Sequence, residues 1–83
     1  MRVNVRYFAS LREAVGQGSE QVETAAATLA ALRDELMSRG PAYAQALAPG
    51  RSVRMALDQV MRDGSAPLHE GCEVAFFPPV TGG

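Results

Sequence analysis

The chain has 83 residues, with eight basic and nine acidic side chains and a formal charge of −1, so it forms one small domain around a single core. The balanced charge argues against a nucleic-acid or anionic-membrane partner, and no apolar run approaches the ~18 residues of a membrane-spanning helix. Cys72 is the only cysteine and cannot form an internal disulfide. Because the first residues also lack a secretion-signal pattern, we expect a cytoplasmic protein.

The first 16 residues predict a strand followed by a short helix. Residues 2–8 alternate between two faces, as in a half-buried strand. One face carries Val3, Val5 and Tyr7, and the other carries Arg2, Asn4, Arg6 and Phe8. Ser10 and Glu13 have the spacing of a capping box, and Gly16 can close the helix in a left-handed conformation. We therefore expect about two helical turns here.

The middle of the chain predicts an edge strand and then the main helix. Residues 19–24 are polar apart from Val22, which fits an edge strand. Thr28 precedes a helix that we expect to include Arg39 in its last turn and to end at Gly40-Pro41. Its apolar positions are Leu29, Leu32, Leu36 and Met37. Residues 42–48 suit a loose helical turn before Pro49-Gly50.

The second half returns to a period of two from Arg51 onward, which predicts a third strand. Val53, Met55 and Leu57 share one face of it, and Arg54, Ala56 and Asp58 share the other. Residues 59–62 allow a short strand before the Asp63-Gly64 turn. In the final strand, 72–77, Val74 and Phe76 lie opposite Ala75 and Phe77 until Pro78-Pro79 stops the strand.

This order of elements predicts an α+β roll, in which a small mixed sheet packs on one main helix. We expect residues 1–77 to form the domain and residues 78–83 to form an extended tail. Six residues reach about 20 Å when extended. Pro78 and Pro79 stiffen the base of this tail, Val80 and Thr81 follow, and Gly82 and Gly83 have no Cβ atom to obstruct a narrow channel.

Terminal glycines are also common at inert chain ends, so the tail composition by itself leaves both interpretations open. The wider sequence adds a resemblance. Residues 71–83, GCEVAFFPPVTGG, and residues 5–16, VRYFASLREAVG, resemble the ends of the small, sulfur-carrying subunits of molybdopterin synthase, the MoaD family of ubiquitin-like β-grasp proteins. Two positions depart from that family's pattern: Asp58, where many relatives have Asn, and Cys72, where an acidic residue is usual.

The resemblance implies a cycle of reactions at the carboxylate of Gly83. An E1-like (MoeB-like) enzyme would use ATP to adenylate it, and a sulfur donor system would convert it into a thiocarboxylate. The tail would then enter a MoaE-like large subunit and donate sulfur to precursor Z (cyclic pyranopterin monophosphate), which forms the molybdopterin dithiolene. The family also suggests a heterotetramer. The sequence itself has no phosphate-binding loop, metal-ligand spacing or nucleophile-base pair, so we expect no stably bound cofactor or metal.

Strand parity places Phe8 and Phe77 on the sheet face away from the main helix, where exposed aromatic residues suggest a docking patch. By resemblance, Met61 joins them at the partner interface. The alternative is that one or both aromatic rings belong to a satellite core under the Pro49 loop. We interpret His69 as a solvated turn residue and Cys72 as an incidental small residue without a sulfur-carrying role.

Three other functions compete with that of the molybdopterin synthase carrier. One is a sulfur carrier for another pathway, such as thiazole or cysteine biosynthesis. Another is a ubiquitin-like modifier whose activated tail forms isopeptide bonds with lysines. The last is a non-catalytic interaction domain with an inert tail.

Overall fold

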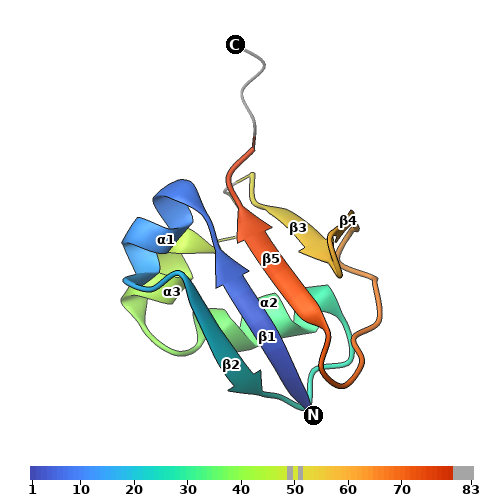
Figure 1. Ribbon diagram of the computed structural model, residues 1–83. Helices are drawn as coiled ribbons and strands as arrows, with labels where there is room; N and C mark the ends of the chain where they lie inside the picture. The colour runs from blue at the N-terminus through green and yellow to red at the C-terminus, as the bar shows by residue number, and fades with distance from the viewer. Residues whose placement is uncertain (49, 51, 80–83) are drawn as a thin grey trace.

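A computed structural model describes residues 1–48, 50 and 52–79 of the chain. The elements in chain order are β1 (Arg2–Tyr7), α1 (Ala9–Val15), β2 (Ser19–Glu23), α2 (Leu29–Met37), α3 (Pro41–Ala46), β3 (Arg54–Leu57), β4 (Val60–Met61) and β5 (Glu73–Phe77). The five strands form one sheet in the order β2-β1-β5-β3-β4 (Figure 1). Strands β1 and β5 pair in parallel at its centre, and the other neighbouring strands pair antiparallel. The predicted α+β roll with a mixed sheet is confirmed.

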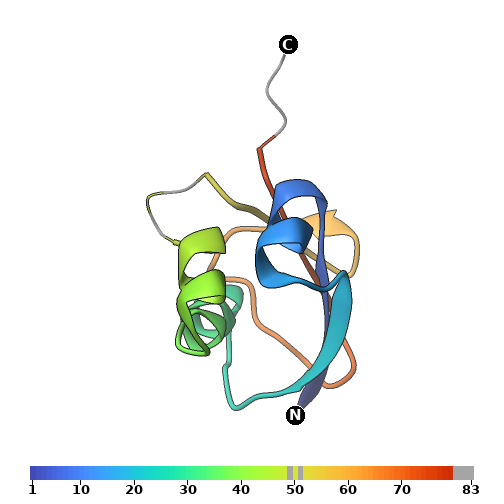
Figure 2. The same cartoon turned by 90° about the vertical axis from the view of Figure 1, so that its left-hand side faces the viewer.

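One face of the sheet is covered by α2 and α3, and no helix of the described residues lies on the other face (Figures 1 and 2). The covered face holds the predicted inner residues of the central strands. All are at most 1% exposed: Val3, Val5, Tyr7, Val74 and Phe76. Leu29, Leu32 and Leu36 of α2 pack against them in one core cluster. The predicted edge strand is also confirmed, because β2 lies at one end of the sheet and buries Val22.

Helix α2 begins where the sequence predicts, because its first N–H groups all find acceptors. The Thr28 side chain accepts a hydrogen bond from the Ala31 N–H at 3.2 Å. Leu29 and Ala30 donate to the carbonyls of Ala66 and Gly64 at 3.1 and 2.9 Å. The loop before β5 therefore closes the amino terminus of α2.

The end of α2 differs from the prediction. The helix stops at Met37, and Arg39 lies beyond it instead of in its last turn. Gly40 and Pro41 do not end α2 but begin α3, where proline occupies the first turn. The fixed φ of proline suits that position, and its missing N–H is not needed there. The loose turn expected over 42–48 is thus a short helix.

The capping box predicted for α1 is wrong. The helix starts at Ala9 with Phe8 at its N-cap, and no side chain caps it. Phe8 still donates to the Phe76 carbonyl of the sheet at 3.1 Å, while its own carbonyl accepts from Leu11 at 3.1 Å. Because the chain turns directly from strand into helix, Ser10 already lies inside the first turn. Gly16 closes α1 with a φ of 86°, as predicted.

The β3–β4 connection also corrects the prediction. Strand β3 covers Arg54–Leu57, and the predicted strand start, Arg51, lies outside the described residues. Asp58 is not a strand residue. Asp58 and Gln59 form the two-residue turn between β3 and β4, with φ values of 50° and 70°. Such positive values at both central positions are typical of a type I′ hairpin turn.

Glu20 of β2 joins three further parts of the chain through one carboxylate. It accepts hydrogen bonds from Tyr7 at 2.8 Å, Tyr43 at 3.1 Å and Arg39 at 2.6 Å. Partial burial opposes ionisation of Glu20, but the hydrogen bonds from Arg39, Tyr7 and Tyr43 outweigh it and lower the pKa. Burial and the bond to Glu20 raise the pKa of Tyr7. The carboxylate therefore stays ionised and holds β1, β2 and α3 together.

We predict that Glu20→Ala lowers the free energy of unfolding by roughly 2 kcal/mol, because it leaves the buried Tyr7 hydroxyl without its acceptor. Urea unfolding at pH 7 measures this change. Since the pKa of Glu20 is lower in the folded chain, its contribution is present above pH 4.5 and is lost as the pH falls through the folded value. Glu13→Ala, at an exposed position of α1, is the control. Equal losses of stability for Glu20→Ala and Glu13→Ala would contradict the stabilising role of the Glu20 carboxylate.

Candidate functional site

The tail leaves the sheet at the carboxyl end of β5. The strand ends at Phe77, and Pro78 and Pro79 follow it outside regular structure, as predicted. Val80, Thr81, Gly82 and Gly83 lie outside the described residues, so their predicted roles stay predictions, as do the tail boundaries 78–83. The end of β1, the start of β3 and helix α1 surround the point of departure (Figure 1). Whatever binds the tail must therefore approach this end of the domain.

The sheet face without a helix, which we call the open face, is arranged in rows across the strands. Arg6, Ala75, Ala56 and Met61 pair in register from β1 to β4 and form the central row. Arg54 pairs with Phe77 in the next row, beside the tail. Asn4 pairs with Glu73 in the row on the other side. Side chains directly opposite one another share a face, so these rows describe the surface that a partner would meet.

A shallow hollow of about 490 Å³ lies at the centre of the open face. Its floor is formed by the small side chains of Ala56 and Ala75. Larger side chains surround them: Arg6, Phe8, Gln59, Met61, Glu73 and Phe77. Ala56 and Ala75 are only 7% and 8% exposed, because the surrounding side chains rise above them. The volume of the hollow is large enough to hold a side chain from another protein.

The structure brings together the three side chains predicted for the docking patch. Phe8 and Phe77 contact each other edge to face, with 6.4 Å between their ring centroids, and Arg6 lies 5.3 Å from the Phe8 ring. Phe8 is 38% exposed and Met61 is 53% exposed. Placement of these aromatic residues on the open face is confirmed. The alternative satellite core invoked Pro49, which lies outside the described residues. Binding of a partner by the patch stays a prediction.

Sequence reasoning missed a polar cluster at the other end of the open face. The His69 Nε2 atom lies 2.7 Å from Asp58 Oδ2, and the Glu73 N–H donates to Asp58 Oδ1 at 2.9 Å. The hydrogen bonds from Glu73 and His69 lower the pKa of Asp58, and the bond to Asp58 raises the pKa of His69. The cluster joins the Asp58–Gln59 turn, which precedes β4 and Met61, to the start of β5. His69 is therefore exposed but not simply solvated.

The described residues offer little for chemistry of their own. No group of three or more His, Cys, Asp or Glu side chains among them could hold a metal ion. Cys72 is 1% exposed and belongs to the core cluster, which agrees with the structural interpretation of this residue. No helix in the described part is long and apolar enough to cross a membrane. The features available for function are the open face and the departing tail.

Comparisons with known proteins find sulfur carrier subunits and small archaeal modifier proteins. The ThiS family matches residues 5–83. The molybdopterin synthase sulfur carrier subunit of Haemophilus influenzae is 40% identical over 81 residues, which cover 98% of this chain and 99% of that protein. Among solved structures, the small archaeal modifier protein SAMP1 of Haloferax volcanii has a TM-score of 0.82 and 25% identity, with full coverage of both chains.

A further structure contains a partner subunit. It is the complex of subunits 1 and 2 of the molybdopterin-converting factor from Helicobacter pylori, in which the matching chain has a TM-score of 0.70 and 26% identity with full coverage of both chains. These similarities extend over nearly the whole chain. The predicted ubiquitin-like β-grasp fold is confirmed.

We predict that Asp58→Asn lowers the pKa of His69 toward its ordinary value of 6.5, because the amide removes the negative charge that favours the imidazolium. An NMR titration of the imidazole measures the pKa directly. The contribution of His69 to stability is present below pH 6.5 and is lost as the pH rises through the raised folded value. A His69 pKa that is unchanged in the variant would contradict the pairing.

Proposed function

The chain belongs to the ThiS family, and from this premise we propose that it is the sulfur carrier subunit of a molybdopterin synthase. The observation that carries the proposal is the 40% identity to a sulfur carrier subunit over nearly the full length of both proteins. Cytoplasmic location, ATP-dependent activation and partner enzymes are parts of the same proposal. The chain acts as a substrate and a subunit of the enzymes that activate and use it.

The chemistry of this proposal takes place at the carboxylate of Gly83. A carboxylate oxygen attacks the α-phosphate of ATP, releasing pyrophosphate and giving an acyl adenylate. A hydrosulfide equivalent from the donor system then attacks the carbonyl carbon and forms the C–S bond. AMP leaves with the electrons of the broken C–O bond, because a phosphate ester is a far better leaving group than oxide, and the proton of the hydrosulfide is lost. The thiocarboxylate that remains carries sulfur covalently. Gly82 next to it has no side chain to obstruct attack, and Pro78 and Pro79 restrict the tail where it leaves β5.

Activation and transfer belong to partner proteins in this proposal, and the open face of the carrier is a shallow surface on which a partner can dock. We propose an E1-like enzyme for adenylation and a large synthase subunit as acceptor of the tail. The large subunit supplies the pocket in which precursor Z receives sulfur and becomes the molybdopterin dithiolene. The complex of two subunits in Helicobacter pylori supports a large-subunit partner. Phe8, Met61 and Phe77 supply the apolar contact with it, in a heterotetramer of two carriers and two large subunits.

Protein modification is the second candidate function. The structural similarity to SAMP1, a small archaeal modifier protein, has a TM-score of 0.82 and supports it. A lysine amine would then attack the carbonyl carbon of the same acyl adenylate, which releases AMP and a proton and forms an isopeptide bond with Gly83. The two functions diverge only after activation, so their products distinguish them.

Intact-mass measurement tests the sulfur carrier function. After incubation with the E1-like enzyme and sulfur donor of the same organism and ATP, we expect the chain to gain the mass difference between one sulfur and one oxygen atom. An added alanine after Gly83 moves the carboxylate and is expected to abolish the gain, while the thermal unfolding of the domain is unchanged. An unmodified wild-type mass, or thiocarboxylation of the untrimmed extended chain, would refute the proposal.

Phe77→Glu tests the docking patch. We predict that it weakens binding to the large subunit at least roughly a hundredfold, because it places a charge within the apolar contact. The fold is retained, since Phe77 faces away from the core. Isothermal titration calorimetry measures binding, and circular dichroism measures folding. Leu68→Glu, at a position partly buried against the core, is the contrasting variant that unfolds the domain. Wild-type affinity in folded Phe77→Glu protein would remove the patch from the interface.

A further inference from the structure

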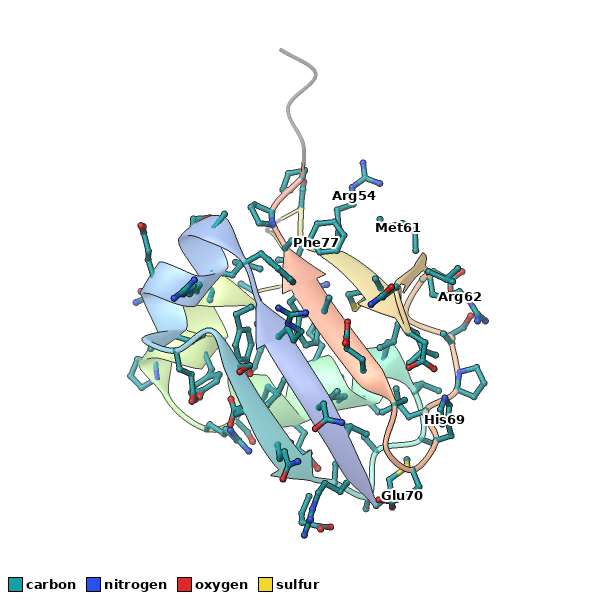
Figure 3. All side chains as sticks on the ribbon, in the orientation of Figure 1. Arg54, Met61, Arg62, His69, Glu70 and Phe77 are labelled. Carbon is teal, nitrogen blue, oxygen red and sulfur yellow. The ribbon has the colours of Figure 1, made fainter. Side chains whose placement is uncertain are left out.

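Charged side chains on the open face are separated along the strands. Arg54 lies beside Phe77, at the end where the tail departs, and Glu70 and His69 lie at the opposite end (Figure 3). Arg6 lines the hollow in its central row and lies over the Phe8 ring. Glu73 lines the hollow one row farther from the tail than Ala75. Arg54 therefore lies on the tail side of the hollow, and Glu73 lies on the side away from the tail.

The charges of Arg54 and Glu73, on either side of the hollow, are not neutralised by ion pairs among the described residues. Arg54 is exposed, and neither Arg54 nor Glu73 forms an ion pair with another of the described residues. Other charged residues of this surface behave differently. Arg2 Nε lies 3.3 Å from Glu23 Oε1, and His69 lies beside Asp58. The paired groups cancel much of each other's field, whereas Arg54 and Glu73 remain available to a partner.

An apolar patch alone does not fix the direction in which two proteins meet, because burial of apolar surface is non-directional. The orientation of a bound partner matters because the tail leaves from one end of the open face, so only one orientation places the partner's acceptor site beside the tail. Charges of opposite sign on either side of the hollow distinguish the two ends. A partner with complementary charges would bind in a single orientation and would reject the reversed one, which places like charges together.

We propose that the open face is a charge-polarised docking surface. Its protein partner inserts an apolar side chain over Ala56 and Ala75, places a carboxylate against Arg54 beside the entrance for the tail, and places a basic group against Glu73. This inference deepens the proposed function and rests on it, because the partner is taken to be the large synthase subunit. Arg54 and Glu73 are thus residues that set orientation and specificity.

A charge swap tests the polarity without altering the net charge. The double variant Arg54→Glu with Glu73→Arg keeps the same composition and inverts only the direction of the charge separation. We expect the Kd for the large subunit of the same organism to rise at least roughly tenfold. We also expect each single variant to weaken binding, and wild-type binding to weaken with rising salt because exposed charges are screened. Calorimetry at three salt concentrations measures all of these.

The matched control is the swap Arg2→Glu with Glu23→Arg, which makes the same two exchanges in a pair that already neutralises itself. We expect it to bind like the wild type. The neutral double variant Arg54→Gln with Glu73→Gln also keeps the net charge, and it provides the test if the swapped chain fails to fold. We expect its binding to be weaker than that of the wild type and less dependent on salt.

The outcomes separate this inference from the proposed function. Suppose that the wild-type chain binds the large subunit and that a folded swap or neutral variant binds with the same affinity and salt dependence. This result would overturn the charge-polarised surface but leave the proposed function intact. Equal weakening by the control swap would overturn the charge-polarised surface too. Wild-type chain that does not bind the large subunit at all would contradict the proposed function, and the inference would fall with it.

Discussion

The parallel pairing of β1 and β5 at the centre of the sheet determines how the rest of the structure is arranged. Because parallel strands end at the same edge, the pairing brings Phe8, which follows β1, against Phe77, the last residue of β5. The tail leaves from that same edge. Two segments that are far apart in sequence, the end of β1 and the end of β5, thus place the apolar patch beside the base of the tail. A protein that covers the patch therefore also lies beside the base of the tail.

The two faces of the sheet divide stability from binding. The covered face buries large apolar residues under α2, and the burial of such side chains is the main source of folding free energy. The centre of the open face carries the small side chains of Ala56 and Ala75 instead of large apolar residues. The apolar side chains of Phe8, Phe77 and Met61 lie around them. Substitutions on the open face can therefore change what the domain binds without unfolding it.

Periodicity predicted the fold well, since alternation in residues 2–8 and 72–77 correctly assigned the inner and open faces. Periodicity gave wrong element boundaries where the chain turns locally, although the alternating or helical pattern of the sequence continues. Alternation carried the predicted third strand through Asp58, but positive φ values make Asp58 part of a hairpin turn. Ser10 and Glu13 matched a capping box, yet the helix begins two residues too early for it, with Phe8 and not Ser10 at the N-cap. The Asp58–His69 pair joins separate turns, and no spacing rule reveals such a contact. The acidic residue at position 58, a departure from the pattern of the similar family, is the available signal.

Reconstitution of the final reaction tests the central claim most directly. Purified thiocarboxylated carrier is mixed with the large subunit of the same organism and precursor Z, without ATP or activating enzyme, and molybdopterin is measured as its oxidised fluorescent derivative. We expect molybdopterin to form in proportion to the thiocarboxylate supplied, with two carriers consumed for each dithiolene. We expect no molybdopterin with a carrier that ends at Gly82. Absence of product with fully loaded carrier and an active large subunit would contradict the central claim.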